Sequence, residues 1–270
     1  MARAQPESQA RLEAEVLLAH AVGHPRAWLY ARPEECPQQA EAERYLLLVE
    51  RRLRGVPLEY LTGRAFFHGI QLEVTPDVLV PRPETELLVG EAMAALQGAP
   101  QPWLADVGTG SGAVALALAH ALPELRAVGT DISLAALRVA ARNVQALGLE
   151  SRVSLVNCDL LSAISSRFAV VVANLPYVSS EDLTGASADV VRHEPRQALD
   201  GGSDGLSVVR RLLAQLADHL QPNGLALLEI GSDQGRAATQ AAHALLPGTD
   251  VAVIPDQWGR ERVLRLRVPG

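Results

Sequence analysis

Residues 103–112 read WLADVGTGSG, a short apolar run followed by a loop in which every second residue is glycine. An apolar run of helical character, residues 113–122, comes next. A buried strand, a glycine loop and a helix form the nucleotide-binding turn of α/β sheets, because glycines without Cβ atoms let a ligand approach the backbone. The sequence therefore predicts a cofactor site at Asp106, Gly108, Thr109, Gly110, Ser111 and Gly112. The G-x-G-x-G spacing departs from the dinucleotide fingerprint.

A second predicted strand, residues 126–130, ends at Asp131. A carboxylate in that place can accept hydrogen bonds from both hydroxyls of a ribose. The alternative is that Asp131 caps the helix predicted over residues 134–147. The glycine loop upstream favours ribose binding.

A third apolar run, residues 168–173, ends in Asn174, Leu175, Pro176 and Tyr177. An amide or exocyclic amine nitrogen is a poor nucleophile, so an enzyme that alkylates it must hold it and aim it. The Asn174 side-chain oxygen and the Leu175 carbonyl can accept the two N–H bonds of an NH2 group, and Tyr177 can stack on the flat group. The alternative is an ordinary turn, because Asn and Pro are common turn residues.

Together with these motifs, the run PRPETE at residues 81–86 resembles the protein glutamine methyltransferases that modify peptide-chain release factors, the PrmC/HemK family. The resemblance extends to Gly63 and Phe67 and to the segments 194–199 and 201–206, and it covers residues 51–268. The Asn-Pro-Tyr ending alone is also similar to that of adenine amino-methyltransferases acting on DNA. The family usually has Pro where this chain has Leu175; the backbone carbonyl survives that change, and Leu175 still precedes a proline, which favours an extended backbone.

The resemblance implies an α/β fold, a seven-stranded Rossmann-like methyltransferase sheet with a small N-terminal helical bundle. It implies that S-adenosyl-L-methionine is the cofactor and that the substrate is the glutamine of the Gly-Gly-Gln motif of peptide-chain release factors. It also implies that Asp159 accepts the adenine amino group, that Leu160 contacts the adenine ring, and that Phe67 and Arg82 lie at the substrate. For Asp159 the alternative is a cap on a following short helix.

Residues 1–75 are predicted to form a helical domain with a connector, and residues 76–270 the methyltransferase domain. The helical part either docks the protein substrate or stabilises the catalytic domain, and the resemblance favours docking. Strands are expected at 153–156, 224–230, 250–254 and 262–268, alternating mostly with helices as in parallel sheets. The last of them alternates Val263, Arg265 and Arg267 with Leu264, Leu266 and Val268, which indicates an antiparallel strand at or near the edge.

The net charge of −7 argues against broad neutralisation of nucleic-acid phosphate, so no direct nucleic-acid binding is expected. The two cysteines, Cys36 and Cys158, lack metal-ligand spacing, and no metal site is expected. The chain shows no apolar stretch long enough for a bilayer and no signal core, which predicts a cytoplasmic protein without membrane contact. Two alternatives remain: an adenine amino-methyltransferase on DNA or RNA, and a cofactor-binding adaptor without activity.

Overall fold

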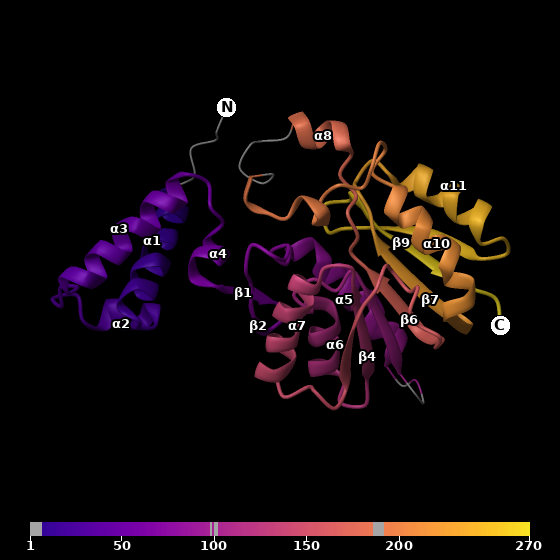
Figure 1. The fold of residues 1–270 in the computed structure, drawn as a ribbon, viewed down its shortest axis with the longest axis horizontal. Helices are drawn as coiled ribbons and strands as arrows, with labels where there is room; N and C mark the ends of the chain where they lie inside the picture. Colours follow the sequence, from indigo (N-terminus) through magenta and orange to yellow (C-terminus); the bar gives the residue numbers. More distant parts are fainter. Residues whose placement is uncertain (1–6, 98, 100–101, 186–191) are drawn as a thin grey trace. The chain divides into compact units, whose positions relative to one another are not determined.

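The chain forms two compact units, Met1–Arg64 and Ala65–Gly270, in a computed structural model that describes residues 7–97, 99, 102–185 and 192–270 (Figure 1). The sequence alone predicts the division after residue 75. Across the described residues, no helix combines the length and the apolar character needed to cross a membrane.

The first unit consists of four helices: α1 (Glu7–Val22), α2 (Arg26–Ala31), α3 (Gln39–Leu53) and α4 (Leu58–Thr62). Its core is a small cluster of Leu17, Ala21, Leu48 and Leu61. Helix α3 begins with a capping box, in which Glu41 accepts a hydrogen bond from the Gln38 backbone N–H at 2.8 Å. The predicted helical bundle is confirmed.

The second unit is built on a seven-stranded sheet with the order β5-β4-β3-β6-β7-β9-β8. A separate two-stranded sheet pairs β1 (Arg64–Phe67) with β2 (Ile70–Glu73). The strands of the large sheet are β3 (Trp103–Val107), β4 (Arg126–Asp131), β5 (Val153–Asn157), β6 (Phe168–Ala173), β7 (Leu220–Glu229), β8 (Asp250–Pro255) and β9 (Glu261–Arg267).

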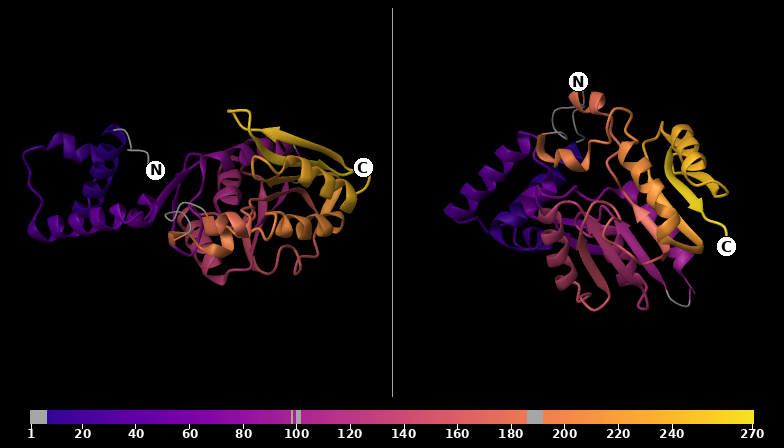
Figure 2. Two further views of the ribbon diagram at one scale, coloured as in Figure 1. Left: turned by 90° about the horizontal axis from the view of Figure 1, so that it is seen from above. Right: turned by 45° about the vertical axis from the view of Figure 1, so that its right-hand side comes forward.

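Strand β9 runs antiparallel to both of its neighbours, β7 and β8, whereas the other strand pairs of the seven-stranded sheet are parallel. It lies second from the edge, and β8 is the edge strand; both are drawn in yellow in Figure 2. The predicted late reversed strand near the edge is therefore confirmed.

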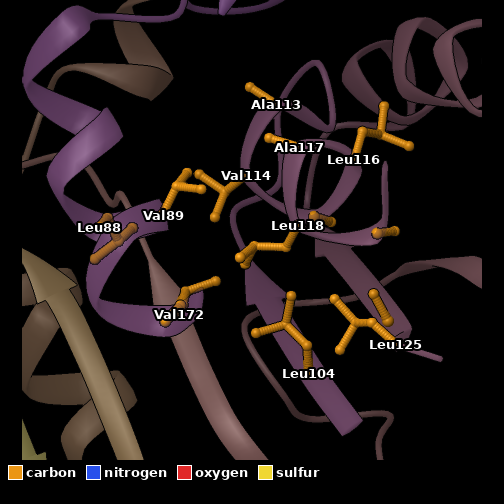
Figure 3. Packing of buried hydrophobic residues seen from close by; sticks show 14 of the residues in the cluster. Leu88, Val89, Leu104, Ala113, Val114, Leu116, Ala117, Leu118, Leu125 and Val172 are labelled. Carbon is orange, nitrogen blue, oxygen red and sulfur yellow. The ribbon is translucent and has the colours of Figure 1, made fainter. Parts of the chain in front are cut away.

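Helices cover both faces of the sheet. On one face α5 (Glu86–Leu96), α6 (Ala113–Ala121) and α7 (Leu134–Ala146) contribute to one apolar cluster. Figure 3 shows Val89 of α5 and Val114 of α6 side by side above the sheet, with Leu104 and Val172 on the strands below. On the other face α10 (Ser207–His219) and α11 (Gly235–Leu245) pack against a second cluster. Three short helices, η1 (Pro83–Thr85), α8 (Ser180–Gly185) and η2 (Arg196–Ala198), lie in the connections.

The strand order reverses between β3 and β6, because the chain runs outward from β3 through β4 to β5 and then returns to β6 on the other side of β3. In open α/β sheets, ligands bind beyond the carboxyl ends of the strands at such a point. The glycine loop after β3 and Asn174 after β6 both lie there.

Candidate active site

A cavity of about 470 Å³ opens at this reversal point, within the range of about 300–1,000 Å³ typical of small-molecule sites. All of its lining residues belong to the second unit. The cavity brings together most of the residues predicted from sequence: Arg82, Asp106, Gly108, Thr109, Gly110, Ser111, Asp131, Asp159, Leu160, Asn174, Leu175 and Pro176. Gly112, Tyr177 and Phe67 are not among the lining residues.

The glycine loop has a backbone that side chains would disturb. Gly108 has a φ of +72°, and a Cβ atom added there would lie 3.0 Å from Cδ2 of Leu175. Leu175 is itself buried, so its side chain has little room to give way. Glycine at position 108 thus lets the loop pack closely against Leu175.

Asp106 holds this loop to the start of α6. Its Oδ2 accepts hydrogen bonds from the Thr109 hydroxyl at 2.7 Å and from the Ala115 backbone N–H at 3.1 Å. Burial raises the pKa of Asp106 to about 6, against the effect of these two donors. Asp106 therefore has a structural task in addition to lining the cavity.

Asp131 also organises the loop around it. Its Oδ2 accepts a hydrogen bond from the Gly110 N–H at 3.0 Å, and its Oδ1 accepts one from the Ser133 N–H at 2.8 Å. Helix α7 is capped by Ser133, whose hydroxyl accepts a hydrogen bond from the Ala136 N–H. Because each carboxylate oxygen can accept more than one bond, Asp131 retains capacity for a ligand in the cavity. Burial raises the pKa of Asp131.

Asp159 forms an ion pair with Arg211 of α10, and both residues line the cavity. The described segment 158–167 consists of turns and irregular backbone, so the alternative that Asp159 caps a helix is wrong. Leu160 has a φ of +54°, a conformation that a branched side chain rarely adopts. The Asp159–Leu160 turn is therefore strained at the wall of the cavity.

Asn174 is the first member of a polar chain that runs through Thr85, which also lines the cavity, to the buried Glu229. Its Nδ2 donates to the Thr85 hydroxyl at 2.9 Å, and that hydroxyl donates to Oε2 of Glu229 at 2.7 Å. The Tyr177 hydroxyl donates to Oε1 of the same carboxylate at 3.4 Å. No other described residue hydrogen-bonds the Asn174 side chain, so its Oδ1 has no partner within the described chain.

Tyr177 and Phe67 lie outside the lining of the cavity. Burial, with the nearby Glu229 carboxylate, raises the pKa of the Tyr177 phenol to about 12, so the hydroxyl stays protonated and can donate. Phe67 is 2% exposed and belongs to the core cluster on the α5 and α6 face of the sheet.

Arg82 lines the cavity and forms an ion pair with the buried Glu194. Glu194 also accepts a hydrogen bond from the Val80 N–H at 3.3 Å. This pair ties the segment before α5 to the segment around residue 195, which lies on the cavity as well. Among the described residues, no group of three or more His, Cys, Asp and Glu side chains could hold a metal ion.

The sequence did not predict the hydrogen bonds and ion pairs of four residues at or near the cavity: Thr85, Glu194, Arg211 and Glu229. Thr85 and Glu194 lie in segments that carry the family resemblance, but nothing local indicates their partners. Glu229 had one available signal, since it is a lone acid in the apolar strand 224–230. An acid in such a place must find donors or a neutralising proton.

Comparison with known proteins gives consistent matches along the chain. The profile of the PrmC N-terminal domain matches residues 2–63, and that of the methyltransferase small domain matches residues 84–239. The chain is 47% identical to a release factor glutamine methyltransferase of Moorella thermoacetica, over 93% of this chain and 89% of that protein. It is 40% identical to a protein of the same name from Xylella fastidiosa, over 96% and 94%. A solved methyltransferase structure from Pyrococcus furiosus shares the fold, with a TM-score of 0.55 at 19% identity, covering 82% of this chain and 98% of that one.

Proposed function

The chain belongs to the release factor glutamine methyltransferase family, and on this premise we propose how its cavity serves the reaction. The protein is an S-adenosylmethionine-dependent protein-(glutamine-N5) methyltransferase. It transfers a methyl group to the side-chain amide nitrogen of the glutamine in the Gly-Gly-Gln motif of release factors.

The cavity residues fit S-adenosylmethionine. The glycine loop leaves its backbone accessible at Gly108 and Gly110, and Asp131 keeps acceptor capacity for the two ribose hydroxyls. Asp159 and Leu160 line the same cavity, and we assign the adenine to them. When bound, S-adenosylmethionine supplies a methyl group on a sulfonium, which is already an activated donor.

The substrate amide is held by Asn174 and the Leu175 carbonyl. The observation that carries this assignment is that Oδ1 of Asn174 has no hydrogen-bond partner among the described residues, while its Nδ2 donates to Thr85 and the residue lines the cavity. An NH2 group needs two acceptors, and Oδ1 with the Leu175 carbonyl would provide them. Good alignment of reacting atoms can contribute about 7–11 kcal/mol to lowering a barrier. No strong base is required before transfer, because the amide proton becomes acidic once the nitrogen carries the methyl group.

The partner is the intact release factor, and we place its docking surface on the helical unit, residues 1–64. A Gly-Gly-Gln loop alone offers few contacts, whereas specific protein interfaces bury on the order of 1,200–2,000 Å² in total. Because the chain is acidic and its substrate is a protein, we expect no direct binding of nucleic acid. Release factors act in the cytoplasm, and we expect the enzyme there.

To test this proposal, the protein is incubated with methyl-labelled S-adenosylmethionine and either intact release factor or adenine-containing duplex DNA. Label is expected on the release factor glutamine only. Asn174→Ala should lower kcat at least about a hundredfold while leaving S-adenosylmethionine affinity within a few fold, because it removes a group that positions the nitrogen. Near-normal turnover of this variant would refute the amide clamp, and label on DNA would favour the adenine methyltransferase.

A further inference from the structure

We propose that Thr85 and Glu229 are positioning residues that fix the Asn174 side-chain amide with its oxygen toward the cavity. This inference rests on the proposed function of Asn174. In the polar chain from Asn174 through Thr85 to Glu229, Asn174 and Thr85 are 89 positions apart in the sequence, and Thr85 and Glu229 are 144 positions apart. The chain of hydrogen bonds is therefore a product of the fold and not of local sequence.

The topology brings the three residues together. Strands β6 and β7 are parallel neighbours in which Ala173 pairs with Leu228, so Asn174 and Glu229 follow at the same level on adjacent strands. Helix α5 packs against both strands, and Thr85 is the residue directly before that helix. The Thr85 hydroxyl therefore lies between the other two side chains.

The direction of each hydrogen bond follows from the carboxylate. An ionised carboxylate only accepts, so the Thr85 hydroxyl must donate its single proton to Glu229. The Thr85 oxygen is then left as an acceptor, and Asn174 meets it with the NH2 end of its amide. The Oδ1 end consequently points away from Thr85, which is the orientation that accepts a bond from a substrate NH2 group.

Burial makes the loss of any of these hydrogen bonds costly in free energy. Glu229 is 1% exposed and Thr85 is 4% exposed, and a buried polar group that loses its hydrogen-bond partner destabilises the fold, more so when it is charged. Tyr177 supplies the second donor to Glu229. The other charged groups that act on the carboxylate are Arg262 of β9, which favours its charge, and Glu84 of η1, which opposes it; Arg82 acts on the neighbouring Tyr177.

Protonation of Glu229 would remove the constraint. A protonated carboxyl group can donate to the Thr85 oxygen, which frees the Thr85 proton to bond Oδ1 of Asn174 and turns the amide NH2 toward the cavity. Two NH2 groups would then face one another. Because burial raises the pKa of Glu229, kcat should fall as the pH decreases through a value above the ordinary range for Glu.

The experiment compares Thr85→Val, Thr85→Ser and Glu229→Gln in the full chain. Thr85→Val should lower kcat at least about tenfold, with S-adenosylmethionine affinity by calorimetry unchanged within about twofold, and Thr85→Ser should restore kcat to within about threefold of wild type. Thr130→Val is the matched control, since Thr130 is buried and its hydroxyl has no hydrogen-bond partner within the described chain. It should leave kcat unchanged.

The pH profile supplies a readout that a purely structural role would not alter. At saturating S-adenosylmethionine and release factor, wild-type kcat should show the acid limb, and Glu229→Gln should lose it. A wild-type profile without that limb, or Thr85→Val with normal kcat, overturns the positioning role, as does a loss of activity in Thr85→Val that Thr85→Ser fails to restore. If Asn174→Ala is also fully active, the amide clamp itself fails; if Asn174→Ala is inactive, only the positioning role does.

Discussion

Gly108→Ala tests whether the glycine loop and the strand end at Leu175 fit together as tightly as the structure indicates. An L-residue with a φ near +72° is strained by about 1–2 kcal/mol, and the lost flexibility of the unfolded chain returns about 0.4–1 kcal/mol. The new Cβ also meets Leu175 Cδ2 at 3.0 Å, and overpacking of this kind costs about 1–3 kcal/mol. The free energy of unfolding should fall by about 2–4 kcal/mol.

Gly110→Ala is the matched control that measures the cost of the positive φ alone. Gly110 has a φ of +57°, but a Cβ there has nothing within 4 Å, so this variant should lose only about 1 kcal/mol. Both variants are measured without cofactor by urea unfolding, followed by circular dichroism and fluorescence, with attention to an unchanged m-value.

A double-mutant cycle with Leu175→Val isolates the contact. Shortening Leu175 makes room for the Cβ at position 108, so Gly108→Ala should cost at least about 1 kcal/mol less in the Leu175→Val background than in wild type. Equal losses for the two glycine variants, or additive free energies in the cycle, would refute the close packing of the loop on Leu175.

Three further predictions concern the cofactor, the buried acid and the helical unit. Asp131→Ala should weaken S-adenosylmethionine binding by about 1–3 kcal/mol in calorimetry, and unchanged affinity in a folded variant would remove Asp131 from the site. Burial raises the pKa of Asp106 from 3.8 to about 6, so the folded protein holds this proton more tightly than the unfolded chain, and stability is lost as the pH rises between these values. The free energy of unfolding of Asp106→Asn, measured in urea relative to wild type, should therefore rise by up to roughly 3 kcal/mol between about pH 4 and pH 7. A difference that does not change with pH would contradict this. Leu46→Glu with Leu53→Glu, on exposed positions of α3, should raise KM for intact release factor but leave activity on a Gly-Gly-Gln peptide unchanged, whereas equal losses with a lower Tm would favour a stabilising role.

Much of the fold could be predicted because its signals are local. The glycine loop, the strand that ends at Asp131 and the strand that ends at Asn174 are each visible within a few residues, and parallel strands bring their carboxyl ends to one edge of the sheet. The reversed β9 was visible as well, because its alternation of Arg with Leu and Val differs from the continuous apolar run of β6.

The side-chain contacts around the cavity could not be predicted because they depend on packing between distant elements. Thr85 meets Glu229 only because α5 crosses β6 and β7, and Arg211 meets Asp159 only because α10 covers the opposite face. The core position of Phe67 is equally a matter of tertiary packing, since an aromatic residue serves a core or a ligand equally well in sequence.

The hairpin of β8 and β9 does not line the cavity, but the position of β9 beside β7 connects the stability of this hairpin to the candidate active site. Strand β8 pairs with β9, and β9 alone joins this hairpin to β7, where Val263 lies opposite Glu229. Detachment of the hairpin as one cooperative piece would therefore hydrate Glu229 while the glycine loop stayed folded. Amide exchange in residues 250–267 would then report on the hydration of Glu229, and, if Asn174 holds the substrate amide as proposed, a destabilising change in the hairpin should lower kcat as well as stability.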